Sequence, residues 1–351
     1  MSLQRSVPRV AQQMARWLSD KLPGGYERRL LREERTYADN SEVHDLPPIF
    51  HYWSHTYVRA MLMEAGADHP DTFFANHLRQ SAGRTGAKQP TFLSIGAGNC
   101  DTEVRLATRL LESGLRDFEI ECLELNGGML ARGRAMAAAS GVERHLVFTK
   151  TDFNRWRAGR RYDGVMANQS LHHVVQLEHL FDEVRGALAD GAWFLASDMI
   201  GRNGHQRWPE ALEEVRRFWR ELPESHHFNH QRRRPEPEYV NRDCSSKGFE
   251  GIRSQDVLPE LLRRFAMPVF VGFGNVIDVF VDRAFGPNFS VDSATDRAFV
   301  DGVHARDEEL LASGALTPTH MFAVMSREPG PVIHHSRGLA PGRCVRAPAA
   351  R

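Results

Sequence analysis

Three histidines stand where apolar runs give way to polar residues, and an imidazole at such a place could accept a proton. His172 and His173 end the run that begins at Tyr162, and His205 follows a second run that ends at Met199. The pKa of an imidazole lies near neutrality, which suits a general base that takes a proton from a hydroxyl or ammonium group. A structural alternative stays open, in which one of the two adjacent histidines caps the next helix or packs against a ligand ring.

The elements that would position these histidines begin with an apolar run at 92–95 that stops at a glycine turn. Glycine is needed there because a side chain would keep the backbone from closing on a ligand. Helical periodicity follows over 102–113, and residues 118–125 read as a second strand with an acid near its end. This order is the skeleton of a nucleoside-binding unit. Its candidate cofactor contacts are Gly96, Ala97, Gly98, Asp101, Glu124 and Leu125.

The residues after the turn favour one nucleoside cofactor over another. A dinucleotide site needs a third glycine or alanine at the helix start, whereas this chain has Asn99, Cys100 and Asp101. The Asp101 carboxylate would repel a diphosphate, which binds at helix N-termini through backbone N–H groups. A sulfonium cofactor carries no phosphate and tolerates the acid. At this point the chain resembles the class I (Rossmann-like) S-adenosyl-L-methionine (SAM)-dependent methyltransferases.

The resemblance continues in order from residue 90 to about residue 198. It implies that Asp152, which follows a third strand, accepts a hydrogen bond from the adenine amino group, and that Phe153 lies near the ring. It also implies that the end of the fourth strand faces the reacting methyl group, where Asn168 and Gln169 stand.

One position departs from the family pattern. Many members carry an acid two residues before the first glycine of the turn, and this chain has Ser94 there. The resemblance therefore implies that another residue, for example Asp101, binds the amino group of the methionine part.

A long insertion follows the fifth strand, which is expected at 192–199. Segments inserted there rise over the carboxyl edge of the sheet, where ligands bind. Together with helices before residue 88 they would form a lid, which favours a small, enclosed substrate. The candidate substrate contacts are Tyr52, Arg202 and Trp208. The structural alternatives are an aromatic core for Tyr52 and a polar loop ahead of a helix for the other two.

Composition excludes several classes of partner. Lys and Arg together number 45, as do Asp and Glu, so no net charge draws the chain to nucleic acid or to an acidic membrane. No apolar run reaches the length of a membrane span. The four cysteines lack metal-type spacing, which is typical of a reduced cytoplasm.

A second group of histidines, at 226–230, invites a metal interpretation that the residues do not favour. The spacing is short, and the basic run at 232–234 would repel a cation. We expect no metal site in this chain. A solvated loop is the default, and a contact with an anionic substrate group is the functional alternative.

These patterns predict an α/β Rossmann-like fold with a seven-stranded sheet, helices on both faces and lid insertions. The expected divisions are a helical cap at 1–88 with a linker at 81–86, a SAM-binding core at 89–200, a lid at 201–264, sheet completion at 265–328 and a disordered tail at 329–351.

The predicted activity is SAM-dependent methyl transfer to an O or N nucleophile of a small molecule, by a protein that could form a homodimer. Three alternatives stay open: a non-methylating use of the sulfonium such as cyclisation, an NAD-dependent oxidoreductase, and a non-catalytic binding module.

Overall fold

The computed structural model of the chain describes residues 26–27, 29–30, 46–246 and 248–346. These residues form an eight-stranded sheet in the order β10-β8-β9-β5-β4-β1-β2-β3 and a small hairpin, β6-β7. The strands are β1 (Thr91–Ile95), β2 (Glu119–Glu124), β3 (Leu146–Lys150), β4 (Tyr162–Asn168), β5 (Leu188–Met199), β6 (Phe228–Asn229), β7 (Arg234–Pro235), β8 (Ala266–Phe273), β9 (His320–Ser326) and β10 (His334–His335).

Helices connect these strands and surround the sheet. The α-helices are α3 (Pro48–Trp53), α4 (Arg59–Glu64), α5 (Pro70–Thr85), α6 (Asp101–Glu112), α7 (Gly127–Ala139), α8 (Leu177–Ala187), α9 (Pro209–Glu221), α10 (Ser254–Leu262), α11 (Asp278–Val281) and α12 (Ala294–Ser313). Short turns of other helix types are η1 (Ser54–Val58), η2 (Glu143–His145), η3 (Leu171–His173), η4 (Asn203–His205), η5 (Glu224–His227), η6 (Cys244–Ser246), η7 (Gly286–Asn288), η8 (Ser336–Gly338) and η9 (Pro341–Cys344).

The sheet has a doubly wound topology that creates one ligand-binding edge. β1 pairs in parallel with both β2 and β4, and β9 alone among the described strands of this sheet runs antiparallel to its neighbours. The chain therefore reverses its direction of winding between β1 and β4. Open α/β sheets bind ligands in the crevice at the carboxyl ends of the strands at such a point. The predicted α/β Rossmann-like fold is confirmed, but the sheet has eight strands rather than seven.

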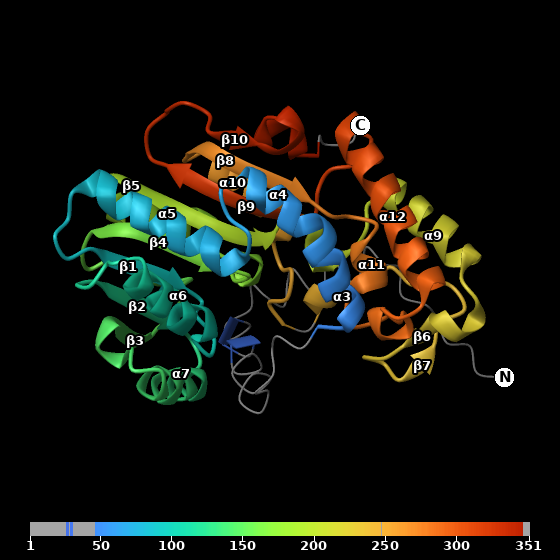
Figure 1. Ribbon diagram of the computed structural model, residues 1–351, viewed down its shortest axis with the longest axis horizontal. Coiled ribbons are helices and arrows are strands. Elements are labelled where there is room, and N and C mark those ends of the chain that lie inside the picture. The colour runs from blue at the N-terminus through green and yellow to red at the C-terminus, as the bar shows by residue number, and fades with distance from the viewer. Residues whose placement is uncertain (1–25, 28, 31–45, 247, 347–351) are drawn as a thin grey trace.

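Helices cover both faces of the sheet and bury two hydrophobic cores. Helices α4, α5 and α6 cross the near face in Figure 1, and their apolar side chains form one core with β8, β9 and the cap helices. The other core lies between the opposite face of the sheet and helices α8 and α10. Residues of β1, β4 and β5 alternate between the two cores. The strand ends that carry the functional groups are thereby held rigidly.

A group of helices lies beyond the carboxyl ends of the central strands and includes α3, α9, α11 and α12 (Figure 1). Aromatic rings tie these helices together: Phe280 of α11 packs against Phe299 of α12 at a centroid distance of 5.3 Å and against Phe218 of α9 at 6.2 Å. The Trp53 indole of α3 donates a hydrogen bond to His304 of α12. A segment that precedes β1 in the sequence and segments that follow β5 thus build one cap.

The expected linker at 81–86 is instead the last turn of α5. Ser81 is fully buried, donates to the Asp163 carbonyl and accepts from the Trp193 backbone N–H. The helix ends at Gly86, whose φ of 71° is the left-handed conformation that favours glycine at a helix end. Small residues in this segment allow close packing against β4 and β5 rather than flexibility.

The prediction of a disordered tail at 329–351 is wrong for the part of it that the structure describes. Residues 334–335 form β10, which pairs in parallel with β8. The Arg337 guanidinium then donates to the Gly272 carbonyl at 2.6 Å and forms an ion pair with Glu308. The unpaired edge of β8 offers backbone partners that composition alone does not reveal.

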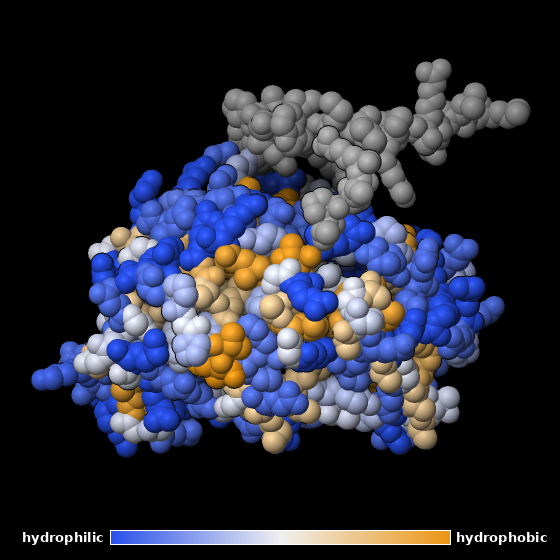
Figure 2. Space-filling view, turned by 90° about the horizontal axis from the view of Figure 1, so that it is seen from above, coloured by the Kyte–Doolittle hydropathy of each residue, from blue (hydrophilic) through white to orange (hydrophobic). Residues whose placement is uncertain are grey.

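Figure 2 shows one face of the molecule, on which hydrophobic residues form small patches among hydrophilic ones. Within the described ranges, each helix is too short or too polar to serve as a membrane span.

Candidate active site

The turn after β1 has the backbone geometry that requires glycine. Gly96 and Gly98 have φ values of 70° and 57°, and a Cβ on Gly96 would lie only 2.5 Å from the Ser170 Cβ. The N–H groups of Gly96 and Ala97 donate to the Leu123 carbonyl at 2.9 and 3.0 Å. The turn therefore closes tightly between the ends of β2 and β4. Helix α6 begins directly after it, as the sequence predicts.

The Glu124 carboxylate joins this turn to the end of β2. Its two oxygens accept hydrogen bonds from the backbone N–H groups of Gly98 and Asn126, both at 2.9 Å. Burial raises the pKa of Glu124 above its ordinary value, although these hydrogen bonds oppose that shift. Leu125 follows it and is half-buried. A carboxylate at this place can accept hydrogen bonds from ribose hydroxyls.

Asp152 and Phe153 follow β3 and reach the same edge. A Cβ on Gly96 would lie 3.8 Å from the Phe153 ring, so this ring stands beside the glycine turn. The Tyr26 hydroxyl donates to both oxygens of Asp152 at 2.8 Å. Tyr26 also packs against the Phe249 ring at a centroid distance of 5.6 Å. This tyrosine has no recognisable motif around it, and sequence analysis did not identify it.

A buried carboxyl group from α6, that of Glu103, lies beside Ser94, the position at which the family pattern has an acid. The Ser94 hydroxyl donates to Glu103 Oε1 at 2.6 Å, and both side chains are buried. Burial raises the pKa of Glu103 to about 7, against its ordinary value of 4.5, although the Ser94 hydrogen bond lowers it. Asp101, the residue expected to replace the missing acid, is half-buried at the start of the same helix.

This buried carboxyl makes the stability of the protein depend on pH. The folded state binds the Glu103 proton more tightly than the unfolded state does, so stability is lost as pH rises from about 4.5 to about 7. We expect Glu103→Gln, which keeps the acceptor for Ser94, to raise the free energy of unfolding at about pH 8 by about 1–3 kcal/mol. The two proteins should be nearly equal at about pH 4.5 in urea titrations. A difference that does not change with pH would contradict this account.

The residues at the end of β4 are held against β5. Gln169 has a φ of 53°, its backbone N–H donates to the Ser197 carbonyl at 2.7 Å, and its side-chain amide donates to the Ser197 hydroxyl. Asn168 donates to the Thr102 hydroxyl at the start of α6. A left-handed residue other than glycine is uncommon and marks a constrained turn. Asn168 and Gln169, the two predicted cofactor contacts, thus lie at the carboxyl edge of the sheet, where the chain reverses its direction of winding between β1 and β4.

Asp198, at the end of β5, organises the histidine pair. Its carboxylate is fully buried and accepts the backbone N–H groups of Ser170, Leu171, His172 and Met199 at 2.7–3.2 Å. It also accepts from His172 Nδ1 at 2.7 Å, which leaves Nε2 of that ring facing away. Burial alone would lower the pKa of His172, but the charges of Asp198 and Glu250 and the hydrogen bonds to them raise it to about 10.

Glu250 brings the three predicted histidines together. Its Oε1 lies 2.5 Å from His205 Nε2 and 3.5 Å from His172 Nε2, and its Oε2 lies 3.6 Å from His173 Nε2. Burial would raise the pKa of Glu250, but the histidines lower it well below its usual range. Burial lowers the pKa of His205 despite the same carboxylate. We refer to His172, His173, His205 and Glu250 as the histidine–carboxylate cluster.

The backbone around His205 is constrained to make this contact. His205 has a φ of 55° and Gly204 a φ of 65°. The Gly204 N–H donates to the Gly251 carbonyl at 2.8 Å, and a Cβ on Gly251 would lie 3.0 Å from the His205 ring. Strained residues of this kind persist at functional sites. Gly251 therefore allows the His205 segment to pack closely beside Glu250.

The predicted substrate contacts lie in other networks. The Tyr52 hydroxyl donates to both oxygens of Asp301 at 2.9 and 3.0 Å. The Arg202 guanidinium lies 5.0 Å from the centroid of the Trp208 ring, which Arg346 also contacts at 4.4 Å. These contacts match the structural alternatives for Tyr52, Arg202 and Trp208, and their role toward a substrate stays a prediction.

The second histidine group does not converge. His226 Nε2 lies 3.4 Å from an oxygen of Asp296, and His230 Nε2 lies 2.8 Å from the Asn288 side chain. His227 Nε2 lies 3.1 Å from the Trp219 carbonyl. Each ring has its own partner.

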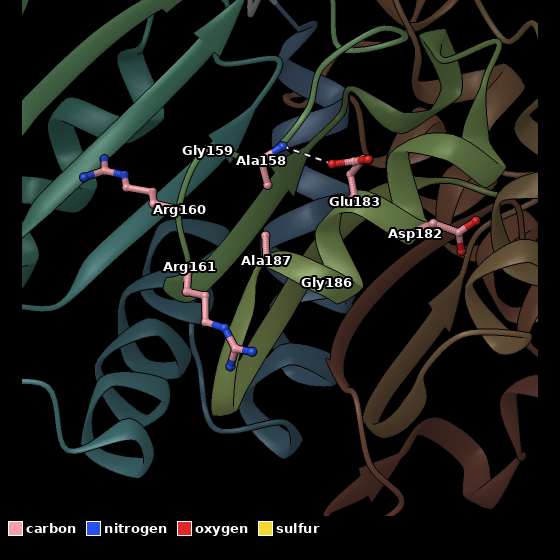
Figure 3. A pocket seen from close by; sticks show the side chains of 8 residues that line it. All are labelled: Ala158, Gly159, Arg160, Arg161, Asp182, Glu183, Gly186 and Ala187. Carbon is pink, nitrogen blue, oxygen red and sulfur yellow. Dashed lines mark hydrogen bonds between the residues drawn. The ribbon is translucent and has the colours of Figure 1, made fainter.

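A surface pocket of about 440 Å³ lies at the other edge of the sheet, where β4 begins (Figure 3). The Ala158 N–H donates to Glu183 across it. Its two arginines are in ion pairs, Arg160 with Glu119 and Arg161 with Asp190. This pocket shares no residue with the candidate site.

The chain resembles methyltransferases of known structure. A geranyl diphosphate C-methyltransferase from Streptomyces coelicolor A3(2), in complex with Mg²⁺, geranyl diphosphate and S-adenosyl-L-homocysteine, is 10% identical over 85% of this chain and 98% of that chain, with a TM-score of 0.44. The StiE O-MT is 11% identical over 79% of this chain and 83% of that chain, with a TM-score of 0.40. The glycopeptide N-methyltransferase MtfA is 24% identical over 39% of this chain and 55% of that chain, with a TM-score of 0.28.

No protein-family model matches the sequence, and no curated protein sequence matches it.

Proposed function

We propose that the protein is a SAM-dependent methyltransferase that acts on an O or N nucleophile of a small molecule. One observation supports this most strongly: the glycine turn, the Glu124 carboxylate and the histidine–carboxylate cluster share one edge of the sheet. The Gly96 turn packs so tightly against Ser170, two residues before His172, that a Cβ on Gly96 would lie only 2.5 Å from the Ser170 Cβ. A cofactor seated on the turn would therefore present its far end to the cluster.

The cofactor side has donors and acceptors that fit an adenosyl group. An ionised carboxylate has about four acceptor sites, and two N–H groups occupy two of those on Glu124. The remaining sites can accept the two ribose hydroxyls. Asp152 can accept a hydrogen bond from the adenine amino group. In this structure the Tyr26 hydroxyl donates to Asp152 instead. Asp101 in the first turn of α6 disfavours a diphosphate, and hence a dinucleotide.

The reaction is an in-line displacement, in which the acceptor atom forms a bond to the methyl carbon as the bond to sulfur breaks. The acceptor loses its proton to a base, and S-adenosyl-L-homocysteine leaves with the electron pair. We assign the base to His205. An ionised carboxylate only accepts hydrogen bonds, so His205 Nε2 carries the hydrogen toward Glu250 and Nδ1 has the lone pair. Its lowered pKa keeps this ring neutral near pH 7.

The lid contributes two groups to the site. Glu250 and His205 both belong to the insertion after β5, whereas His172 and His173 belong to η3, the short helical turn after β4. The cluster is complete only when the insertion lies over the sheet edge. A covered site aligns small reactants and excludes water, which is what methyl transfer requires of a protein.

Calorimetric titration with SAM, S-adenosyl-L-homocysteine and NADH tests the cofactor. We expect one site for each adenosyl ligand with a Kd of about 1–100 μM, and no heat with NADH. Incubation with SAM and a panel of small phenols, alcohols and amines, followed by mass spectrometry, tests the reaction. Release of S-adenosyl-L-homocysteine supports methyl transfer. Release of methylthioadenosine would indicate cyclisation-type chemistry, and binding of NADH alone would overturn the proposal.

A further inference from the structure

Three side chains in the cluster converge in the manner of metal ligands. One ligand atom each from His172, His173 and Glu250 lies within 4.8 Å of the others. The imidazole Nε2 atoms of the two histidines stand 3.5 and 3.6 Å from the two oxygens of the carboxylate. Two imidazoles and one carboxylate form a ligand set used by catalytic zinc sites, which leave a further position open.

These nitrogen–oxygen distances are longer than direct hydrogen bonds. Hydrogen bonds from nitrogen to oxygen are about 2.7–3.2 Å long. Ligands at about 2.0–2.1 Å from a tetrahedral Zn²⁺ are separated from one another by about 3.4 Å. The distances of 3.5 and 3.6 Å in this structure are close to that separation, but they end on different oxygens of Glu250, and the three ligand atoms, which lie within 4.8 Å of one another, would draw closer together on binding the ion.

An outer layer of hydrogen bonds orients two of the three ligands. Asp198 accepts from His172 Nδ1 at 2.7 Å and directs Nε2 toward Glu250, and backbone N–H groups hold Asp198 in turn. His205 Nε2 binds one oxygen of Glu250 at 2.5 Å and fixes that carboxylate. Metal-binding histidines commonly donate their other ring nitrogen to a carboxylate, and the outer partner sets the ring orientation.

A cation would balance the two negative charges beside His172. Asp198 and Glu250 place two carboxylates around one buried histidine, and each is within 3.5 Å of that ring. A proton on His172 supplies one positive charge between them. A divalent ion at Nε2 would supply two and would displace that proton.

We propose that His172, His173 and Glu250 bind a divalent transition-metal ion of the Zn²⁺ class, with an open position for the acceptor oxygen. This departs from the sequence expectation of no metal site. The catalytic part of the inference rests on the proposed function: the ion would make a bound hydroxyl more acidic, and its proton would pass through water to His205 Nδ1, because that nitrogen faces away from Glu250. Binding of the ion can be tested separately from SAM binding and methyl transfer.

Metal titration of the full chain, produced without a histidine tag and stripped with a chelator, tests the site. Co²⁺ is followed by its visible absorption and Zn²⁺ by calorimetry. We expect one ion per chain with nitrogen and oxygen ligands. His173→Ala and Glu250→Gln should each weaken binding by about 100-fold or more, and Asp198→Asn by about 10–100-fold. His230→Ala is the matched control, because it removes a ring from the other histidine group, and it should bind as the parent does.

The same preparations are titrated with SAM, which separates the two proposals. SAM binding with no stoichiometric Co²⁺ binding would overturn the metal site and leave the proposed function intact. Metal binding that is lost in His173→Ala but accompanied by no SAM binding would support the site and overturn the function. Equal losses in His230→Ala and His173→Ala would show scattered surface binding and would also overturn the site. His173 is partly exposed, so its alanine variant should keep its fold, and thermal melts check this.

Discussion

Replacement of Glu124 by glutamine is expected to weaken SAM binding by about 10²- to 10⁴-fold while the protein stays folded. Hydrogen bonds to a charged group contribute about 1.5–3 kcal/mol each, and two ribose hydroxyls would lose such a partner. Glutamine keeps an oxygen for one of the two backbone N–H groups that the carboxylate now binds. The measurement is calorimetric titration with SAM and with S-adenosyl-L-homocysteine, and both ligands should lose affinity by the same factor.

Glu121→Gln is the matched control for this change. Glu121 lies on the same strand and accepts from Thr149 and Tyr162, away from the carboxyl edge. It should change thermal stability without changing the affinity for SAM. Equal affinity losses in the two variants would mean that the effect comes from β2 as a whole, and would contradict the assignment of Glu124 to the ribose.

Replacement of His205 by glycine is expected to lower the turnover number of methyl transfer by about 10²–10⁴-fold, the usual contribution of a general base. The affinity for SAM should not change, since this ring contacts the lid carboxylate rather than the glycine turn. Glycine accepts the φ of 55° at this position without strain. The rate is measured with an acceptor identified in the panel of alcohols and phenols.

Added imidazole distinguishes loss of the base from loss of structure. If His205 removes the proton, imidazole at millimolar concentration should restore part of the turnover in His205→Gly. The restored rate should rise with pH as the free imidazole loses its proton. A turnover within tenfold of the parent, or no recovery in a variant that still binds SAM and melts normally, would contradict the role of His205.

Much of the fold could be predicted because its signals are local. The glycine turn, the acid at the end of β2 and the apolar runs of β1, β4 and β5 lie in short stretches with clear periodicity. Parallel strands bring their carboxyl ends to one edge, so His172 and His173 could be expected near the glycine turn from topology alone. Strand β10, which makes the sheet eight-stranded, could not be expected from the sequence, because it depends on the open edge of β8 rather than on its own two residues.

The candidate site was only partly predictable because its acids come from distant segments. Glu250 stands 45 positions after His205, in a polar insertion whose path no pattern indicates. Glu103 reaches Ser94 from the next helix, beside the strand position at which the family pattern expects an acid. Tyr26 reaches Asp152 across 126 positions. In each case a tertiary contact brings the side chain to the site. The residues next to it in the sequence do not indicate that contact.

The contacts of Tyr26 have a kinetic consequence. This residue touches both Asp152, at the cofactor end of the crevice, and Phe249, next to the lid carboxylate, while Arg29 donates to the Gly248 carbonyl. The Tyr26 hydroxyl occupies both oxygens of Asp152, so under the proposed function adenine must displace it in order to bind. Entry and exit of the cofactor would then each require the Tyr26 contacts to rearrange, and this step rather than bond exchange would set the pace of each cycle.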